Sequence, residues 1–222
     1  MPNRIHVASA LLDAGIIPLL YDPDPEVCCR LAHTLYEGGA RVLEYTNRGL
    51  AAHEVFYALR RYADRHLPGM VLGAGTLLEA GTTALYLQYG ADFIVAPSLS
   101  EAVGRTCHAR NVLWIPGCTT PTEIAQGHAL GAEIVKLFPS DLVQPGFVRA
   151  LRGPMPWATL MVTGGVTPDE AGIVPWFEAG AACVGIGSSL FVRENGKLNE
   201  SRTSERMQQA LQVLRTWRAS HP

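Results

Sequence analysis

Short apolar runs recur along the chain, separated by longer segments in which apolar and charged residues alternate at helical spacing. Apolar runs of this length are typical of strands that are buried on both faces of a parallel sheet. The pattern predicts eight strands, at residues 16–20, 41–46, 70–73, 93–96, 112–115, 134–138, 160–162 and 183–186. The segments between them predict amphipathic helices, most clearly at 26–36, 51–65, 80–89, 101–109 and 168–178.

A repeated Gly-Ala pair marks the passage from helix to strand. It occurs at Gly39-Ala40, Gly90-Ala91, Gly131-Ala132 and Gly180-Ala181. Glycine readily takes the left-handed backbone conformation that ends many helices, so the repeat supports an alternation of helices and strands. Eight strands in this order predict an α/β fold, a (β/α)8 TIM barrel formed as a single domain by residues 1–222. A doubly wound open sheet is the rival fold, but it would have fewer strands at this length.

The last segment predicts a C-terminal helix at residues 201–218. Its apolar side chains, among them Met207, Leu211 and Leu214, fall on one face and would pack on the barrel wall. A barrel of this kind often takes about 200–250 residues, which matches the length of 222.

Composition and charge limit the kinds of binding partner that the protein can have. With a net charge of -2, the chain lacks the clustered basic excess that a nucleic-acid-binding surface needs. No apolar run approaches the ~18 residues that span a bilayer, and the start of the chain has no signal-peptide core. The five cysteines form no CxxC pair. We therefore expect a reduced, cytoplasmic protein that acts on a small molecule and binds neither nucleic acid nor membrane.

Lysine usage draws attention to one position. The chain has only two lysines, Lys136 and Lys197, among 18 basic residues. Lys197 lies in a polar turn, whereas Lys136 lies within a predicted strand. A lysine that faces the barrel interior loses hydration, which disfavours its charged form and enlarges the neutral fraction that can form a Schiff base. The alternatives are a structural ion pair with Glu44 or a position at a strand edge.

Active sites of TIM barrels lie at the C-terminal ends of the strands. Glu44 and Arg48 lie at the end of the second predicted strand and Thr76 follows the third. A carboxylate that faces Lys136 can transfer protons, and the planar guanidinium of arginine suits a substrate carboxylate. Taken singly, a glutamate at such a position is more often exposed on the surface. An isolated arginine is more often a surface charge, and an isolated threonine is more often a turn hydroxyl.

Two glycine-containing loops follow the seventh and eighth strands, where many barrels bind phosphate. They contain Thr163-Gly164-Gly165 and Gly187-Ser188. Glycines let backbone N–H groups approach an anion, and the N-terminus of a following helix would add donors. The alternative is that they are ordinary turn glycines. The histidines form no HxH or HExxH pair, so no metal site is expected.

Several motifs together resemble one enzyme family. They are Gly38-Gly39-Ala40-Arg41-Val42-Leu43-Glu44, Thr46-Asn47-Arg48, Gly73-Ala74-Gly75-Thr76, Lys136-Leu137-Phe138-Pro139, Thr163-Gly164-Gly165-Val166 and Gly185-Ile186-Gly187-Ser188. In order and identity they resemble the 2-keto-3-deoxy-6-phosphogluconate / 4-hydroxy-2-oxoglutarate aldolase family. The match covers roughly residues 15–191.

The resemblance implies a class I aldolase with a barrel fold that uses neither a metal nor another cofactor and is usually a homotrimer. It implies that Lys136 forms the Schiff base and that Glu44 is the general acid and base. The substrate-binding residues that it implies are Arg48 and Thr76 for the pyruvate carboxylate, Pro97 and Phe138 for the pocket wall, Thr163 for a further substrate contact, and Gly164, Gly165, Gly187 and Ser188 for the distal phosphate.

The implied reaction is the reversible cleavage of 2-keto-3-deoxy-6-phosphogluconate to pyruvate and glyceraldehyde 3-phosphate, a step of Entner-Doudoroff carbohydrate metabolism. The chain departs from the family's best-known members at Tyr45, Gly49, Ser98 and Ser140-Asp141. The phosphogalactonate epimer and 4-hydroxy-2-oxoglutarate therefore remain alternative substrates. Two further alternatives are a phosphosugar decarboxylase or isomerase, and a non-catalytic barrel that binds a phosphorylated ligand.

Overall fold

Parallel strands form a barrel in the computed structural model, which describes residues 3–194 and 197–221. Around the barrel the strands follow the order β5-β4-β3-β2-β1-β9-β8-β7-β6. Their bounds are β1 Ile16–Leu20, β2 Val42–Thr46, β3 Val71–Gly75, β4 Phe93–Val95, β5 Leu113–Ile115, β6 Gly117–Cys118, β7 Val135–Leu137, β8 Leu160–Thr163 and β9 Cys183–Ile186.

The barrel closes through a strand that is divided at Pro116. On one side β5 pairs with β4, and on the other β6 pairs with β7, where Gly117 lies opposite Lys136. Only Pro116 separates β5 from β6, and proline has no N–H to donate to a sheet ladder. Its carbonyl oxygen still accepts from the Lys136 N–H at 2.8 Å. β5 matches the predicted fifth strand at 112–115, β6 continues the same strand beyond Pro116, and the predicted (β/α)8 barrel is confirmed.

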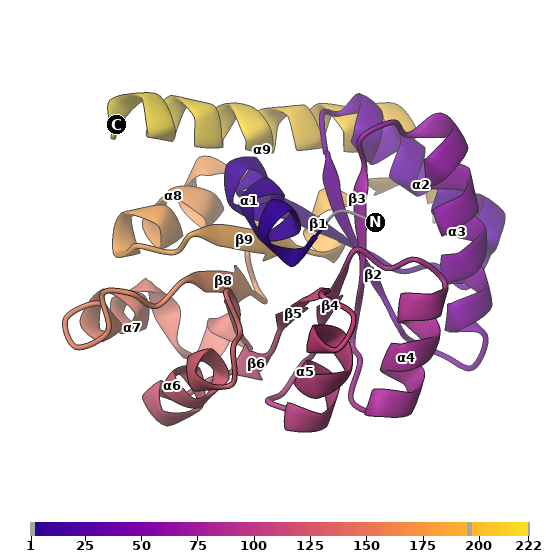
Figure 1. Cartoon of the computed structure of the whole chain (residues 1–222). Coiled ribbons are helices and arrows are strands. Elements are labelled where there is room, and N and C mark those ends of the chain that lie inside the picture. Colours follow the sequence, from indigo (N-terminus) through magenta and orange to yellow (C-terminus); the bar gives the residue numbers. More distant parts are fainter. Residues whose placement is uncertain (1–2, 195–196, 222) are drawn as a thin grey trace.

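Helices surround the barrel (Figure 1). They are α2 Pro25–Glu37, α3 Ala52–His66, α4 Ala80–Gln88, α5 Glu101–His108, α6 Pro121–Ala129, α7 Gln144–Leu151, α8 Glu170–Ala179 and α9 Glu200–Ser220. The helices predicted from spacing are confirmed with small shifts at their ends, and α9 extends the predicted C-terminal helix at both ends. The four glycines of the Gly-Ala pairs all have left-handed φ angles, between 88° and 101°.

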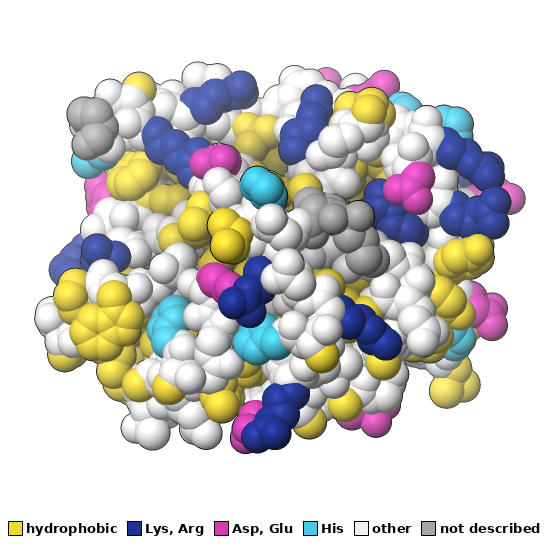
Figure 2. Space-filling view, in the orientation of Figure 1, with side chains coloured by type: hydrophobic (Ala, Val, Ile, Leu, Met, Phe, Trp, Pro, Cys, Tyr) yellow, Lys and Arg dark blue, Asp and Glu magenta, His cyan; other side chains and the backbone are white. Residues whose placement is uncertain are grey.

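An additional helix, α1 (Arg4–Ala14), closes the N-terminal end of the barrel, where it crosses the ring of strands (Figure 1). Its buried residues Val7, Ala8 and Leu11 belong to the same apolar cluster as inward-facing strand residues such as Val42 and Phe93. The barrel interior is therefore apolar and filled at the α1 end. On the outer surface at this face of the molecule, side chains of both charges are scattered (Figure 2).

The opposite end carries shorter elements. The 3-10 turns η1 (Ser140–Leu142) and η2 (Ser188–Leu190) follow β7 and β9, and the chain then forms the hairpin β10 (Arg193–Glu194) and β11 (Lys197–Leu198) before α9. The second, larger apolar cluster lies outside the barrel, between the strands and the helices. No helix among the described residues is long and apolar enough to cross a membrane.

We expect Leu11→Ala to lower the free energy of unfolding by ~2–5 kcal/mol, because Leu11 is fully buried and its loss leaves a cavity beneath the barrel. Urea denaturation measures the change. Ile5→Ala on the same helix is the control, because Ile5 is 69% exposed and its replacement should change stability by less than about 0.5 kcal/mol. Equal losses of stability in the two variants would contradict the conclusion that the buried face of α1 closes the end of the barrel.

Candidate active site

A cavity of about 740 Å³ opens at the C-terminal ends of the strands. All eleven residues predicted for the site line it: Glu44, Arg48, Thr76, Pro97, Lys136, Phe138, Thr163, Gly164, Gly165, Gly187 and Ser188. They come from β2, β7 and β8 and from the loops that follow β2, β3, β4, β7, β8 and β9. The structure thus brings together residues that are up to 144 positions apart in the sequence (188 minus 44).

Lys136 is the central residue of β7 and is only 5% exposed. Its backbone is held on both sides, since it pairs with Gly117 of β6 and Met161 of β8. The Nζ atom lies 4.9 Å from the centre of the Phe138 ring, a distance at which a cation and an aromatic face attract each other. The lysine is thus an interior residue that faces the cavity, and it does not lie at a strand edge.

Glu44 of β2 is completely buried and lines the same cavity. Neither of its carboxylate oxygens has a hydrogen-bond partner among the described residues. Burial raises the pKa of Glu44, while the positive charges of Lys136 and Arg48 act in the opposite direction. Between described residues, no ion pair within 4.0 Å joins Glu44 to Lys136, so a structural salt bridge does not explain the lysine.

Gly75 of β3 provides the space for the Glu44 side chain. A Cβ atom at Gly75 would lie 1.8 Å from Glu44 Oε1, far inside van der Waals contact. The two residues are brought together by the parallel pairing of β2 and β3. A glycine at this inward position is therefore required for the carboxylate to occupy the barrel interior.

The turns after β2 and β3 present Arg48 and Thr76. The Asn47 N–H donates to the Gly75 carbonyl at 2.8 Å, and the Tyr86 hydroxyl donates to Asn47 Oδ1 at 2.9 Å. Arg48 follows this fixed turn and is exposed at the cavity mouth. Thr76 has a left-handed φ of 63°, which is unfavourable for a β-branched residue and typical of functional sites.

The loop after β8 has two glycines and packs closely against the chain that follows β7. Gly164 and Gly165 both have left-handed φ angles, and the buried Ser140 hydroxyl donates to the Gly164 carbonyl. The expected helix N-terminus is not available behind this loop. α8 begins only at Glu170, and the carboxylate of Asp169 already accepts from its first turn, at the Gly172 N–H, at 2.8 Å.

Some lining residues were not predicted. Tyr21 and Phe191 contribute aromatic surface, and Arg193 contributes a further guanidinium. Tyr21 directly follows β1, so attention to every strand end would have found it. Phe191 and Arg193 lie beyond the last strand of the barrel, in a segment whose sequence carries no comparable signal.

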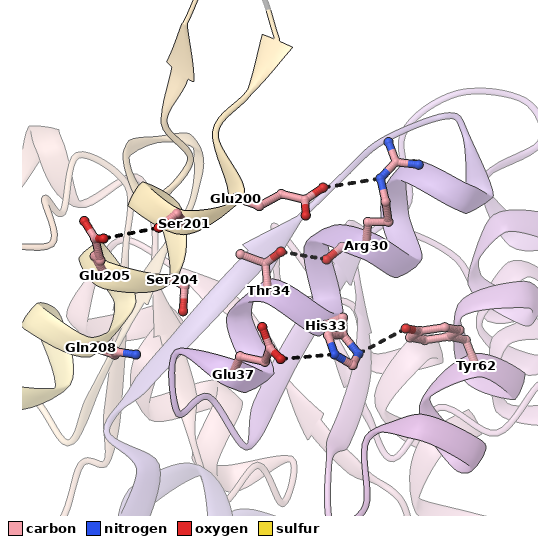
Figure 3. Close-up of a pocket in the computed structure, with 10 residues that line it drawn as sticks. All are labelled: Arg30, His33, Thr34, Glu37, Tyr62, Glu200, Ser201, Ser204, Glu205 and Gln208. Atoms are coloured by element: carbon pink, nitrogen blue, oxygen red, sulfur yellow. Dashed lines mark hydrogen bonds and ion pairs between the residues drawn. The ribbon is translucent and has the colours of Figure 1, made fainter.

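A second hollow of about 530 Å³ lies on the outer wall between α2, α3 and α9 (Figure 3). Its polar side chains contact one another, as in Arg30–Glu200 at 3.4 Å and His33–Glu37 at 3.5 Å. It contains none of the predicted site residues. Within residues 3–194 and 197–221, no three His, Cys, Asp or Glu side chains cluster so as to hold a metal ion.

We expect Glu44→Gln to stabilise the protein at pH 8 but not at pH 4. Because burial raises the pKa of Glu44, the folded protein keeps this proton over a pH range in which the unfolded chain has lost it. The free energy of unfolding therefore falls as the pH rises from the ordinary glutamate pKa to the raised one. Glutamine loses no proton, so the variant avoids this loss.

Thermal unfolding at the two pH values measures the difference, and 1 kcal/mol corresponds to roughly 2–4 °C at this chain length. Glu178→Gln is the matched control, because Glu178 is an exposed glutamate at the end of α8. A Glu44→Gln variant that is less stable than the wild type at pH 8 would show that the carboxylate is stabilised in its charged form.

Comparison with known proteins agrees with this geometry. The chain is 32% identical to the 2-dehydro-3-deoxy-phosphogluconate aldolase of Haemophilus influenzae over 162 residues, which cover 72% of this chain and 74% of that protein. It is 33% identical over 131 residues to the 2-dehydro-3-deoxy-6-phosphogalactonate aldolase of Escherichia coli, covering 59% of this chain and 61% of that one.

Among solved structures, the 2-keto-3-deoxy-6-phosphogluconate aldolase of Zymomonas mobilis superposes with a TM-score of 0.80 at 26% identity. The superposition covers 92% of this chain and 95% of that one. A sequence profile described as KDPG and KHG aldolase matches residues 7–206, which is nearly the whole chain. The protein therefore belongs to the KDPG and KHG aldolase family and is a lyase of the aldolase class.

Proposed function

We propose that the protein is a class I aldolase that cleaves 2-keto-3-deoxy-6-phosphogluconate to pyruvate and glyceraldehyde 3-phosphate through a Schiff base on Lys136. The observation that carries the proposal is the burial of Lys136 and Glu44 in one cavity without a direct ion pair between them. An amine that is not engaged by its neighbouring carboxylate can attack a ketone, and the carboxylate can serve the proton transfers that follow.

In the first step the neutral Lys136 amine attacks the keto carbon of the substrate. The keto oxygen takes up a proton, which gives a carbinolamine, and this loses water to form the protonated imine. Glu44 delivers and removes the protons, since burial raises its pKa and lets it hold a proton at a higher pH than an exposed glutamate does. The imine then provides the electron sink for carbon–carbon bond cleavage.

In the second step a base removes the proton of the C4 hydroxyl, and the C3–C4 bond breaks. The bond's electron pair moves to the imine and gives an enamine, while C4 leaves as the aldehyde. Protonation of the enamine at C3 restores the imine, and water hydrolyses it to release pyruvate and the free lysine. Thr163, whose buried hydroxyl oxygen has no partner among the described residues, is suited to contact the substrate at this point.

The cavity provides for both ends of such a substrate. Arg48 and Thr76 hold the carboxylate at the side of β2 and β3 and Pro97 and Phe138 shape the pocket wall. The loops with Gly164, Gly165, Gly187 and Ser188 hold the distal phosphate through backbone and hydroxyl donors. The similarity to a phosphogalactonate aldolase supports the epimer as the second candidate substrate. We also propose that the protein is a homotrimer, as the family resemblance implies, and that it is cytoplasmic, as its cysteine usage indicates.

We expect borohydride reduction in the presence of pyruvate to add a stable three-carbon mass to Lys136. Peptide mass spectrometry locates the adduct. Lys136→Met should give no adduct and lower kcat by about 10⁴-fold or more, because the nucleophile is lost. The chain offers a matched control, Lys197→Met, which removes its other lysine and should leave both readouts unchanged. A wild-type protein without an adduct, or a Lys136→Met variant with full turnover, would rule out the proposed mechanism.

We expect Gly75→Ala to lower kcat by about 100-fold, because the added methyl group would displace the Glu44 carboxylate by an ångström or more. Steady-state kinetics of aldol cleavage measure the loss, and circular dichroism verifies folding. Gly146→Ala is the control, since a Cβ atom at that position of α7 meets nothing within 4 Å. Full activity of a folded Gly75→Ala variant would show that the position of Glu44 does not matter.

A further inference from the structure

We propose that Arg193 determines specificity by binding the distal phosphate of the substrate, and that the N-terminal part of α9 fixes it in position for this purpose. Arg193 lies in β10 and lines the cavity together with Ser188 and Ser189 of η2. The proposal rests on the aldolase function proposed above and adds a residue that the strand-end pattern did not identify.

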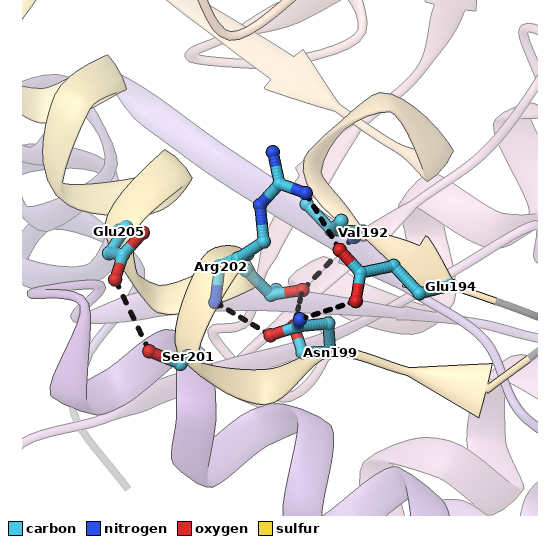
Figure 4. A network of polar contacts seen from close by, with 7 residues as sticks. Val192, Glu194, Asn199, Ser201, Arg202 and Glu205 are labelled. Carbon is cyan, nitrogen blue, oxygen red and sulfur yellow. Dashed lines mark hydrogen bonds and ion pairs between the residues drawn. The ribbon is translucent and has the colours of Figure 1, made fainter.

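The residues on both sides of Arg193 are anchored at the start of α9, Val192 through its backbone and Glu194 through its side chain (Figure 4). The Val192 N–H donates to the buried Thr203 hydroxyl at 3.0 Å, and the Asn199 N–H donates to the Val192 carbonyl at 2.8 Å. On the other side, the Glu194 carboxylate accepts from Arg202 at 2.7 Å and from Asn199 Nδ2 at 3.0 Å. Arg193 therefore lies between two residues that are tied to the start of one long helix.

This anchoring decides where Arg193 points. In a strand, successive side chains point to opposite faces, so anchoring of Glu194 toward α9 turns Arg193 the other way, toward the cavity. Its ion pair with Asp22 Oδ2 is 4.0 Å long, beyond the ~2.7–2.9 Å of a charge-assisted hydrogen bond. Asp22 thus attracts the guanidinium to the mouth of the cavity without a close contact that would occupy its N–H donors.

The position of Arg193 around the barrel matches the far end of a long substrate. Arg193 follows β9, which is separated from β7, the strand of Lys136, only by β8. The phosphorus of 2-keto-3-deoxy-6-phosphogluconate lies twice as many bonds from the keto carbon as the distal carboxylate of 4-hydroxy-2-oxoglutarate does. Arg193 lines the cavity beside η2 and away from the strand of Lys136, so we assign it to the more distant group, the phosphate.

The charges in the cavity leave Arg193 available for this role. Among the described lining residues the cations are Arg48, Lys136 and Arg193, and the one carboxylate is the buried Glu44. In the proposed reaction Lys136 forms the Schiff base, and Arg48 binds the substrate carboxylate. A guanidinium binds phosphate with two parallel hydrogen bonds, so Arg193 adds a directed contact to the donors of the glycine loops.

The test compares two aldehydes that differ only in their phosphate, in the condensation with pyruvate. For Arg193→Met we expect the KM of glyceraldehyde 3-phosphate to rise about 5- to 30-fold with kcat nearly unchanged, the range of one partly exposed charged hydrogen bond. The KM of glyceraldehyde should change less than about twofold. Competitive inhibition by inorganic phosphate should weaken by the same factor as the binding of glyceraldehyde 3-phosphate.

Arg30→Met is the matched control, because Arg30 is an arginine of similar exposure, 55% against 52%, that is paired with Glu200 on the outer wall. It should leave every constant unchanged. Equal effects on both aldehydes, or unchanged inhibition by phosphate in Arg193→Met, would overturn the proposal for Arg193 while pyruvate still labels Lys136. Absence of that label in the wild-type protein would instead overturn the aldolase function, and the proposal for Arg193 with it.

Discussion

The burial of an amine and a carboxylate in the same barrel interior is the constraint on which the rest of this structure depends. Removing charged groups from water is costly unless they are paired, yet Lys136 and Glu44 are buried and form no direct ion pair with each other. The space that Glu44 needs is provided by Gly75 on β3, and the α1 end of the barrel is filled by the apolar cluster that α1 completes. Apolar packing in the half of the barrel nearer to α1 thus offsets the destabilising burial of polar groups in the other half.

Most of the fold follows from the sequence because burial on both faces leaves a distinct mark. Strands between a filled interior and a layer of helices are mostly apolar, and the runs at β1, β5 and β9 are of this kind. Two features left no such mark. α1 lacks a clear apolar face because apolar residues also lie on its solvent side, such as the exposed Ile5. The division of the fifth strand at Pro116 depends on which neighbour each part pairs with.

The site was predictable to the extent that topology alone gathers residues. In a parallel barrel all C-terminal strand ends meet at one rim, so Lys136, Glu44 and the glycine loops had to share a cavity once the strands were known. Contacts that depend on register or on chain beyond the barrel could not be foreseen. The fit of Glu44 against Gly75 requires the exact pairing of β2 with β3, and the direction of Arg193 is set by Glu194 and α9.

The closure of one barrel end by α1 has a kinetic consequence. Among the described residues, the apolar cluster fills the α1 end of the barrel, and the cavity that holds the buried Lys136 opens at the other end, where Arg48 and Arg193 lie. In the proposed reaction the aldehyde fragment is formed nearest the exit, while the three-carbon fragment is still bonded to the lysine below it. The two products must therefore depart in a fixed sequence, the aldehyde first and pyruvate last, and in the reverse direction pyruvate must enter before its partner.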